Sequence, residues 1–348
     1  MSMSSADRVF SDVAVVIIGR NEGERLRRCL HSVSARAAVV VYVDSGSTDG
    51  SVEMARATGA KVVELDLSAP FTAARARNSG LQVLLDRHPA IEFVQMIDGD
   101  CVLRDGWLDE ALAALQRDRG LAVVFGRRRE REPTRSIYNA LCDDEWNIPV
   151  GEAAGCGGDA LFRVAALRSA AGYNETMIAG EESELSMRLR KKGWRIECLD
   201  VEMTWHYADM VRFSQFWNRM RRSGHAYAEL AHRHPDAKWP DWPRSCRSIE
   251  FWGGAMPLAL IGSIVLAIVH HPLWLVATVV ALLPWPLKMI QLAHRQRRRG
   301  LDPKTAIGSG VLFMVGKLAQ IQGLASFHIH RWRGRTSQII EYKGPRPA

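Results

Sequence analysis

Two carboxylates separated by a single glycine follow an apolar stretch in the first third of the chain. Residues 93–97 read as a buried strand, and Asp98-Gly99-Asp100 comes directly after it. In an extended chain residues i and i+2 point to the same side, so the two carboxylates repel each other unless a cation joins them. Mg²⁺ and Mn²⁺ take one or two carboxylates and complete their shells with water and diphosphate oxygens. The pattern therefore predicts a divalent-cation site at Asp98 and Asp100.

A second polar segment, Asp44-Ser45-Gly46-Ser47-Thr48-Asp49-Gly50, follows another apolar run. Its glycines and short side chains allow a tight turn that can approach a ligand closely. Asp44, at the end of the run, can accept hydrogen bonds from a base or a ribose. A turn with a helix cap at Ser47 or Thr48 explains the same residues without any ligand. Both interpretations stay open.

A third segment, Gly180-Glu181-Glu182-Ser183-Glu184, opens a predicted helix that closes on Arg190-Lys191-Lys192. Acids in the first turn and bases in the last turn fit the helix dipole by themselves. Glu181 and Glu182 are adjacent, however, and point in different directions, which capping does not require. One of them can serve as a general base whose pKa is raised by its neighbour.

Alternating strands and helices must position these acids. From residue 13 to about 130, short apolar runs alternate with amphipathic stretches, which predicts an α/β unit with a mainly parallel sheet. Ligands of such sheets gather at the carboxyl ends of the strands, where Asn21 and Glu22 also fall. The charge run of residues 127–131 is predicted to be a solvated loop. The predicted strands are 13–18, 39–43, 61–65 and 93–97, and the predicted helices are 22–35, 49–58, 72–86, 106–117, 180–192 and 213–232.

Length and composition narrow the classes of protein to which this chain can belong. A chain of 348 residues has room for about two domains. The charged and apolar fractions, 24% and 47%, exclude disordered and collagen-like proteins. A net charge of +8 suits an anionic partner, whether a phosphate-bearing substrate, a membrane surface or nucleic acid. The six cysteines lack the spacing of a zinc site or a disulfide framework, which favours a reducing compartment.

Taken in order along the chain, these segments resemble the family 2 inverting glycosyltransferases with the GT-A fold, a nucleotide-diphospho-sugar transferase fold. The resemblance covers about residues 13–210. Each segment is a weak signal alone, but six in the family's order are a strong one. They are Gly19-Arg20-Asn21-Glu22, Asp44-Ser45-Gly46-Ser47-Thr48-Asp49, Ala76-Arg77-Asn78-Ser79-Gly80, Asp98-Gly99-Asp100, Gly157-Gly158-Asp159 and Gly180-Glu181-Glu182.

The resemblance implies a role for each matching residue. Asp98 and Asp100 would hold Mg²⁺ or Mn²⁺ on the diphosphate of a sugar nucleotide. His206 would be a further ligand or diphosphate contact, or else a histidine whose hydrogen bonds are merely satisfied at the domain surface. Glu182, or else Glu181, would be the catalytic base; the family commonly has Asp at the second of these positions. The nucleotide sugar would contact Asn21, Glu22, Asp44, Ser45, Gly46, Arg77, Asn78, Asp98 and Gly99, and the sugar or acceptor would contact Gly157, Gly158 and Asp159.

The Q-x-x-R-W pattern of polymerising relatives is absent at its expected place, because Gln215-Phe216-Trp217-Asn218-Arg219 has a different spacing. This departure favours the transfer of one sugar over the synthesis of a polymer.

The C-terminal third predicts membrane attachment. Residues 251–287 contain no Asp, Glu, Lys or Arg over 37 positions, more than a soluble helix needs. A helical hairpin over 250–292 fits, with the arginines at 295–299 on the cytoplasmic side by the positive-inside rule. Residues 305–327 include Lys317, Gln320 and Gln322, so we expect an interfacial or re-entrant helix there. The predicted domains are 1–210 (catalytic), 211–249 (interface helices and linker), 250–292 (hairpin) and 293–348 (basic loop, third helix and tail).

The sequence therefore predicts a glycosyltransferase at the cytoplasmic (inner) membrane, with its catalytic domain on the cytosolic face. It would move one sugar from a UDP- or GDP-sugar to a hydroxyl of a lipid-linked acceptor, in surface polysaccharide or glycolipid assembly. Two alternatives are a polyprenyl-phosphate glycosyltransferase, which needs no base, and a membrane scaffold that binds nucleotide sugars without turnover. Nucleic acid is not expected as a partner, because the arginines lie beside apolar segments rather than among stacking aromatics.

Overall fold

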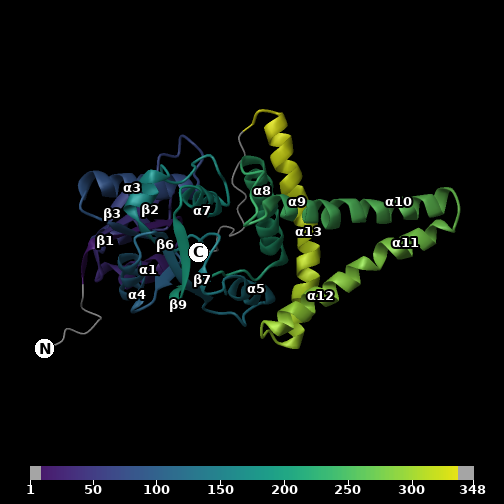
Figure 1. The fold of residues 1–348 in the computed structure, drawn as a ribbon, viewed down its shortest axis with the longest axis horizontal. Helices are drawn as coiled ribbons and strands as arrows, with labels where there is room; N and C mark the ends of the chain where they lie inside the picture. The colour runs from purple at the N-terminus through teal and green to yellow at the C-terminus, as the bar shows by residue number, and fades with distance from the viewer. Residues whose placement is uncertain (1–8, 336–348) are drawn as a thin grey trace. The chain divides into compact units, whose positions relative to one another are not determined.

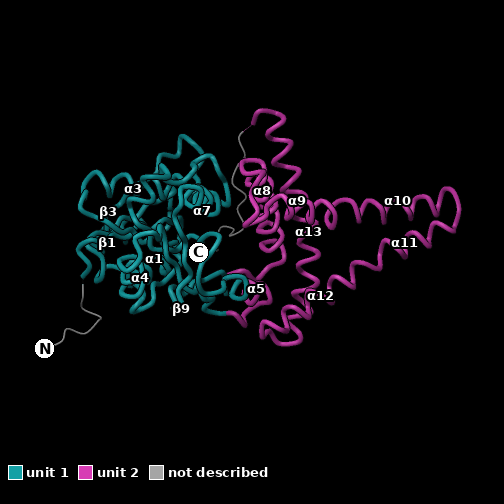
Figure 2. The backbone as a smooth tube through the Cα atoms, in the orientation of Figure 1, with its two compact units in different colours: residues 1–132, 142–208 teal, residues 133–141, 209–348 magenta. Residues whose placement is uncertain are grey.

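The computed structural model describes residues 9–335 and divides the chain into two compact units (Figures 1 and 2). Unit 1 contains residues up to 132 together with 142–208, and unit 2 contains 133–141 together with the residues from 209 onward. The division at 208/209 lies close to the predicted end of the catalytic domain at 210. The four-domain division itself stays a prediction.

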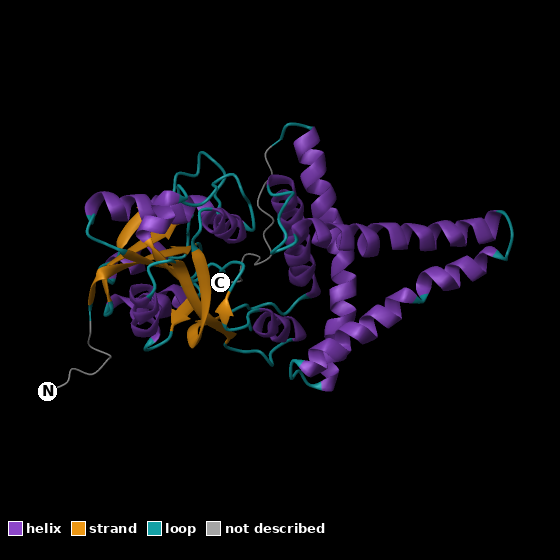
Figure 3. Ribbon diagram, in the orientation of Figure 1, coloured by secondary structure: helices purple, strands orange, loops and turns teal. Residues whose placement is uncertain are grey.

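Unit 1 contains one mixed nine-stranded sheet with helices packed on it (Figure 3). The strand order is β3-β2-β1-β4-β8-β6-β9-β5, with β7 beside β9. Strands β1 to β4 pair in parallel, as do β6 and β9, while β8 runs antiparallel between β4 and β6. The strands are β1 (Phe10–Gly19), β2 (Ala37–Asp44), β3 (Lys61–Glu64), β4 (Phe93–Asp98), β5 (Cys101–Leu103), β6 (Leu121–Glu130), β7 (Gly151–Glu152), β8 (Ala160–Arg163) and β9 (Arg195–His206).

The helices of unit 1 cover both faces of this sheet, with α3 on one face and α1 and α4 on the other (Figure 1). The predicted stripe of α1, which includes Leu26 and Leu30, is fully buried. Helix α3 lies close to β1 at Gly80, where an added Cβ would stand 2.5 Å from Val16. The helices of this part are α1 (Glu24–Ser34), α2 (Ser51–Ala57), α3 (Ala73–Arg87), α4 (Trp107–Arg117), α5 (Ile137–Glu145, which spans a division between the units), α6 (Val164–Ser169) and α7 (Glu181–Lys191).

Every predicted strand and helix of the α/β region is present, with ends within a few residues of those expected. The prediction of a loop at 127–131 is wrong for residues 127–130, which form the last part of β6. Partial burial of these arginines among carboxylates, described below, is the physical reason: the charges are compensated inside the fold instead of by water.

Unit 2 is helical, and its long apolar helices satisfy the length and composition of membrane spans. Three qualify among the described residues, Trp242–Val269, Trp274–Arg298 and Pro303–Trp332, and the most apolar parts of the first two are almost entirely exposed. The elements are α8 (Phe213–Arg233), α9 (Trp242–Ile249), a π-helical turn η2 (Glu250–Ala255), α10 (Met256–Val269), α11 (Trp274–Leu282), α12 (Pro284–Arg298) and α13 (Pro303–Trp332).

Helix α13 runs across the base of the hairpin that α10, α11 and α12 form, instead of alongside it (Figure 1). Glycines make the crossings close. Gly224 of α8 faces the carbonyl of Gln320, and Gly310 of α13 faces the carbonyl of Met289 in α12, each with no room for a Cβ. Small residues at helix crossings allow this approach in water and in lipid alike.

Candidate active site

The ends of β1 and β2 hold the first group of predicted residues. Asp44 is buried at the end of β2, where its Oδ1 accepts from the Tyr42 hydroxyl at 2.8 Å. Its Oδ2 accepts from the amides of Gly46 at 2.9 Å and Ser47 at 2.7 Å. Burial, and next Asp44, raise the pKa of Tyr42, so its hydroxyl stays a donor. The turn is thus fixed around the carboxylate.

Asn21 ties this turn to β1. Its Oδ1 accepts from the Thr48 amide at 2.8 Å, and its own amide donates to Ser47 Oγ at 2.8 Å. Asn21 adopts a positive φ of 54°, which asparagine tolerates better than most residues. The Ser45 amide donates to the Gly19 carbonyl at 3.0 Å. The structure therefore brings Asn21, Asp44, Ser45 and Gly46 together at the ends of β1 and β2, while their contacts with a nucleotide stay a prediction.

Glu22 lies between the ends of β1 and β4. It forms an ion pair with Arg25, and a Cβ added at Gly99 would stand 3.4 Å from its Cγ. The Gly99 amide donates to the Ile18 carbonyl at 2.8 Å. Gly99 therefore connects Glu22 and the end of β1 to the D-x-D segment.

Arg77 is the centre of a buried charge cluster that joins three elements. Its guanidinium, 3% exposed, lies 3.0 Å from a carboxylate oxygen of each of Asp98, Glu181 and Glu182. It also stacks over the Tyr173 ring at 5.5 Å. Burial opposes its charge, but the carboxylates, Glu182 foremost, keep the pKa of Arg77 well above its ordinary value. The start of α7 and the end of β4 are thereby held together.

The two glutamates of this cluster differ in access and in protonation. The Glu181 side chain is 4% exposed and the Glu182 side chain 19%. Burial, and next the Glu181 carboxylate, raise the pKa of Glu182 to about 7, although Arg77 lowers it. Glu182 therefore combines access to solvent with a pKa suited to proton transfer near neutral pH.

Arg128, which lies in the run predicted as a loop, is a site residue that sequence reasoning missed. Its Nη2 lies 2.8 Å from Asp159 and 3.3 Å from Asp98, and its guanidinium lies over the Trp146 ring at 5.4 Å. Asp159 also accepts from the Asp98 amide at 3.0 Å and from the Thr204 hydroxyl at 2.9 Å. The recorded contacts of Asp159 thus hold Asp98 in place. The predicted contact of Asp159 with the sugar stays a prediction.

The glycines before Asp159 clear space for this cluster. A Cβ added at Gly158 would stand 2.6 Å from Arg77 Nη2 and 2.9 Å from Asp98 Oδ2, so no larger residue fits without displacing the ion pair. Gly157 is exposed and has open space around it. Gly158 thus lies beside the Arg77 cluster, and the predicted contacts of Gly157 and Gly158 with the sugar or acceptor stay predictions.

Asp100 faces a different partner from Asp98. Its Oδ2 lies 3.4 Å from His206 Nε2, and both side chains are buried. His206 Nδ1 lies 3.7 Å from Glu130, and the Trp146 ring packs edge-on at 4.6 Å. Among the residues described, the clusters with metal-ligating geometry are Asp100-Cys101-His206 and Asp98-Cys101-Asp159, so the two aspartates fall in adjoining groups rather than one.

The donor set suits a hard divalent cation at Asp100 and His206. Burial raises the pKa of the Cys101 thiol well above its ordinary value, so the soft ligand stays protonated. The Asp100 carboxylate, the ligand type that suits Mn²⁺ and Mg²⁺, remains, with the His206 imidazole beside it. The structure brings Asp100 and His206 together as predicted, while metal binding itself stays a prediction.

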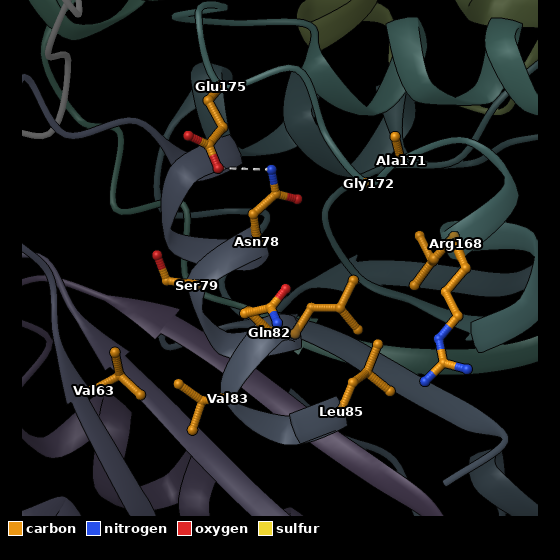
Figure 4. Close-up of a pocket in the computed structure, with 12 residues that line it drawn as sticks. Val63, Asn78, Ser79, Gln82, Val83, Leu85, Arg168, Ala171, Gly172 and Glu175 are labelled. Carbon is orange, nitrogen blue, oxygen red and sulfur yellow. Dashed lines mark hydrogen bonds between the residues drawn. The ribbon is translucent and has the colours of Figure 1, made fainter. Parts of the chain in front are cut away.

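Asn78 points away from these groups. Its side chain donates to the Tyr173 carbonyl at 2.8 Å and to Glu175 at 2.9 Å, and it accepts from the Tyr173 amide at 2.9 Å. It lines a pocket of about 660 Å³ between α3 and the segment after α6, together with Ser79, Gln82 and Arg168 (Figure 4). The structure does not bring Asn78 to the Asp44 turn, because adjacent helical residues, here Arg77 and Asn78, project about 100° apart.

Comparison with known proteins bears on this arrangement. Residues 14–168 match the family model for glycosyl transferase family 2. The matched segment contains the Asp44 turn, Arg77 and the D-x-D pair.

Curated proteins similar to this chain include the pre-mycofactocin glycosyltransferase of Mycobacterium tuberculosis, 29% identical over 66% of this chain and 49% of that protein. The succinoglycan biosynthesis protein ExoA of Rhizobium meliloti is 26% identical over 62% of this chain and 69% of its own length. The chain thus spans about half the length of the mycobacterial relative.

Among solved structures, the mannosyltransferase PcManGT from Pyrobaculum calidifontis, in complex with GDP-Man and Mn²⁺, superposes with a TM-score of 0.57. The alignment covers 91% of this chain and 87% of that one at 18% identity. This similarity confirms the GT-A-like fold with C-terminal helices that was predicted.

Proposed function

We propose that this protein is an inverting, metal-dependent glycosyltransferase that moves one sugar from a nucleotide-diphosphate sugar to a hydroxyl of a lipid-linked acceptor. The observation that carries the proposal is the Arg77 cluster. One arginine lies 3.0 Å from the first aspartate of the D-x-D and 3.0 Å from the candidate base. These two contacts support a site in which the donor side and the acceptor side of the reaction meet at Arg77.

Glu182 supplies the base in this mechanism. A hydroxyl is a poor nucleophile, so a carboxylate must accept its proton as it attacks the anomeric carbon. With a pKa of about 7, Glu182 is partly ionised at neutral pH and still basic enough to accept that proton. Direct displacement from the face opposite the nucleotide inverts the anomeric centre. Glu181, more deeply buried, acts by raising the basicity of its neighbour.

The nucleotide side of the reaction falls to the ends of β1, β2 and β4. The exposed Asn21 and the turn that is fixed around the buried Asp44 carboxylate would contact a base and ribose, with Glu22 beside them. When bound by Asp98, Asp100 and His206, Mg²⁺ or Mn²⁺ would neutralise the charge of the leaving diphosphate. Arg128 forms an ion pair with Asp159, and Asp159 in turn accepts a hydrogen bond from the Asp98 amide. The donor is a UDP- or GDP-sugar, and PcManGT, whose fold is similar, has GDP-Man and Mn²⁺ bound.

The membrane helices would present the acceptor. Large exposed apolar side chains cover α10 and α11, among them Ile268, Leu273 and Val276, as expected for a hairpin in lipid. The transverse course of α13 supports an interfacial helix, although its length also satisfies a span. With the arginines at 295–299 on the cytoplasmic side, the hairpin returns the chain to the face where sugar nucleotides occur.

A panel of UDP- and GDP-sugars with Mn²⁺ or Mg²⁺ tests the donor, by thermal shift of the full-length protein. Transfer from the stabilising donor to membrane-lipid extracts tests the acceptor, and NMR of the product's anomeric configuration tests inversion. We expect stabilisation that depends on both metal and nucleotide sugar. A product with retained configuration, or the lack of any donor that stabilises the protein, would overturn the proposal.

A further inference from the structure

Cys101 belongs to both of the clusters with metal-ligating geometry, yet the proposed mechanism makes no use of its thiol. It begins β5 and pairs with His206 of β9 in an antiparallel ladder. Residues that lie directly opposite each other in such a ladder project their side chains to the same face of the sheet. Cys101 is fully inaccessible to solvent, and His206 is buried beside it. A thiol and an imidazole are thus brought together next to Asp100.

The spacing of the ligand atoms fits one small cation. Asp100 Oδ1 lies 3.7 Å from Cys101 Sγ, and Asp100 Oδ2 lies 3.4 Å from His206 Nε2. One ligand atom from each of the three residues lies within 4.8 Å of the others. Zinc bonds of about 2.0–2.3 Å place the ligand atoms of a tetrahedral site about 3.3–3.8 Å apart. The three side chains therefore lie near the separations that a tetrahedral cation requires.

Together, the three donors favour a softer cation than carboxylates favour alone. Thiolate sulfur and imidazole nitrogen suit zinc, whereas Mg²⁺ and Mn²⁺ prefer oxygen ligands. Zinc also lies above Mn²⁺ in the general order of affinity for such sites. A thiol that coordinates zinc gives up its proton, which here passes to water. Three protein ligands leave the fourth position of the metal open. The donor chemistry of this cluster thus points to Zn²⁺.

Glu130 supports the imidazole through its other nitrogen. Its Oε2 lies 3.7 Å from His206 Nδ1, and it accepts from the Ala208 amide at 2.8 Å. Metal-bound histidines commonly direct their second ring nitrogen to a carboxylate, which fixes the ring and raises its basicity. The Trp146 ring packs edge-on against His206 at 4.6 Å. His206 therefore has the surroundings of a metal ligand.

The adjoining cluster at Asp98 and Asp159 is less suited to a cation of this kind. Arg128 Nη2 lies 2.8 Å from Asp159 and 3.3 Å from Asp98, so a guanidinium already compensates both carboxylates. A cation bound there would compete with this arginine for the same oxygens. The Asp100 side of Cys101 is therefore the favoured place for zinc.

We propose that Asp100, Cys101 and His206 form a zinc site that competes with the cation of the transfer reaction. Mn²⁺ and Mg²⁺ leave the Cys101 thiol protonated, whereas Zn²⁺ binds the thiolate. The zinc-loaded site carries one more negative charge than the manganese-loaded site, so it attracts the donor diphosphate less strongly. Zinc should therefore bind more tightly than manganese and inhibit transfer. The inhibition rests on the proposed function, and the zinc site itself does not.

Co²⁺ reports on the thiolate directly, because a cobalt–thiolate bond adds a charge-transfer band in the near ultraviolet. The full-length protein, reduced and in detergent, is titrated with Co²⁺ in the absence of nucleotide sugar. The variants are Cys101→Ser and Cys101→Ala, and Cys29→Ser is the matched control. Cys29 is also fully buried and its thiol lies 3.8 Å from the Asp98 carbonyl, but it belongs to neither of the two clusters.

The affinities for Zn²⁺ and Mn²⁺ are measured in the same proteins, zinc by competition with a colorimetric chelator and manganese by its EPR signal. Wild type and Cys29→Ser should show the cobalt–sulfur band, and Cys101→Ser should lose it. Zinc affinity should fall at least about 100-fold in Cys101→Ser, because the loss of an outer-shell partner alone costs up to that factor. Manganese affinity should stay near wild type. Lack of the band in wild type, unchanged zinc affinity in Cys101→Ser, or an equal loss in Cys29→Ser overturns the site.

Failure of the zinc site and failure of the proposed function are distinguishable. Cobalt and zinc binding are measured without nucleotide sugar, so their outcome stands whether or not the protein transfers sugar. In transfer assays with Mn²⁺, Cys101→Ser should need at least about 100-fold more zinc for inhibition than wild type does. Equal inhibition of both proteins overturns the competition. Thermal unfolding checks each variant, and if the buried hydroxyl of Cys101→Ser prevents folding, Cys101→Ala takes its place with the same expected losses.

Discussion

Replacing Glu182 by Gln separates the proposed mechanism from a merely structural acidic cluster. Gln keeps the shape of the side chain and its hydrogen bond to Arg77 but cannot accept a proton. Turnover should fall by about 10²–10⁴-fold, the usual contribution of a positioned base. Affinity for the nucleotide sugar should change little, because the base acts in the transition state. Steady-state transfer assays with a soluble or extracted acceptor measure both quantities.

The pH profile adds a signature that simple misfolding cannot mimic. With a pKa of about 7 for Glu182, about one tenth of the protein carries the ionised base at pH 6 and about nine tenths at pH 8. Wild-type kcat/KM should therefore rise about tenfold per pH unit below 7 and level off above it. The residual activity of Glu182→Gln should not show this rise with pH.

As pH rises through 7, the free energy of unfolding should decrease while activity increases. The folded-state pKa of Glu182, about 7, lies above the ordinary value of 4.5, so the folded protein holds a proton that the unfolded chain releases. Its contribution to stability is present below pH 4.5 and is lost as pH rises through 7. At pH 8 the Glu182→Gln protein should therefore be more stable than wild type, by on the order of 1–3 kcal/mol in thermal or urea unfolding.

Glu181→Gln is the matched control. Glu181 raises the pKa of Glu182, so its removal should shift the rising limb to lower pH while turnover on the plateau survives. A large loss of turnover in Glu181→Gln, with normal turnover in Glu182→Gln, would assign the catalytic base to Glu181 and leave the mechanism otherwise unchanged. Wild-type turnover in both variants would refute the hydroxyl-acceptor mechanism and favour a phosphate nucleophile, which needs no base.

Three further changes test the groups around this base. Asp100→Asn should abolish the metal dependence of nucleotide-sugar binding, measured by calorimetry with and without Mn²⁺, while unfolding stays cooperative; unchanged metal dependence would contradict the metal assignment. Asn78→Ala should lower stability by about 1–3 kcal/mol through its lost hydrogen bonds to residues 173–175, with nucleotide affinity near wild type; lost affinity at unchanged stability would restore its predicted role in the nucleotide site. Gly158→Ala should reduce turnover at least tenfold by displacing Arg77 from Asp98, and unaltered kcat/KM would show that this ion pair is dispensable.

The sequence was sufficient for β1 to β4 and the helices between them because their signals are local, whereas β5 to β9 were not among the predicted strands. The apolar runs of β1, β2 and β4 and the stripe of α1 are each complete within about ten residues. Parallel strands then bring their carboxyl ends to one edge, where Asp44 lies opposite Gly19 and Glu22 lies beside Gly99. The pairing of Asp100 with His206 followed from the resemblance rather than from spacing, since 106 positions separate them.

Long-range charge compensation could not be predicted from the sequence. The run at 127–131 looks solvated on its own, because the carboxylates that meet Arg128 come from positions 98 and 159. Arg77 and Asn78 are neighbours in the sequence, yet only Arg77 reaches the cluster. The D-x-D likewise divides between two sets of partners, because β4 ends at Asp98 and the chain turns before Asp100.

The balance of charge in the site explains why metal and donor should bind together. Around Arg77 and Arg128 the structure gathers five carboxylates, from Asp98, Asp100, Asp159, Glu181 and Glu182. Their net charge is about −3 when all are ionised and about −2 when Glu182 holds a proton. Such a site repels a free diphosphate and attracts a divalent cation. A divalent charge brings the site close to neutrality, and the diphosphate can then enter against Arg77 and Arg128. Donor affinity should therefore depend steeply on the divalent cation.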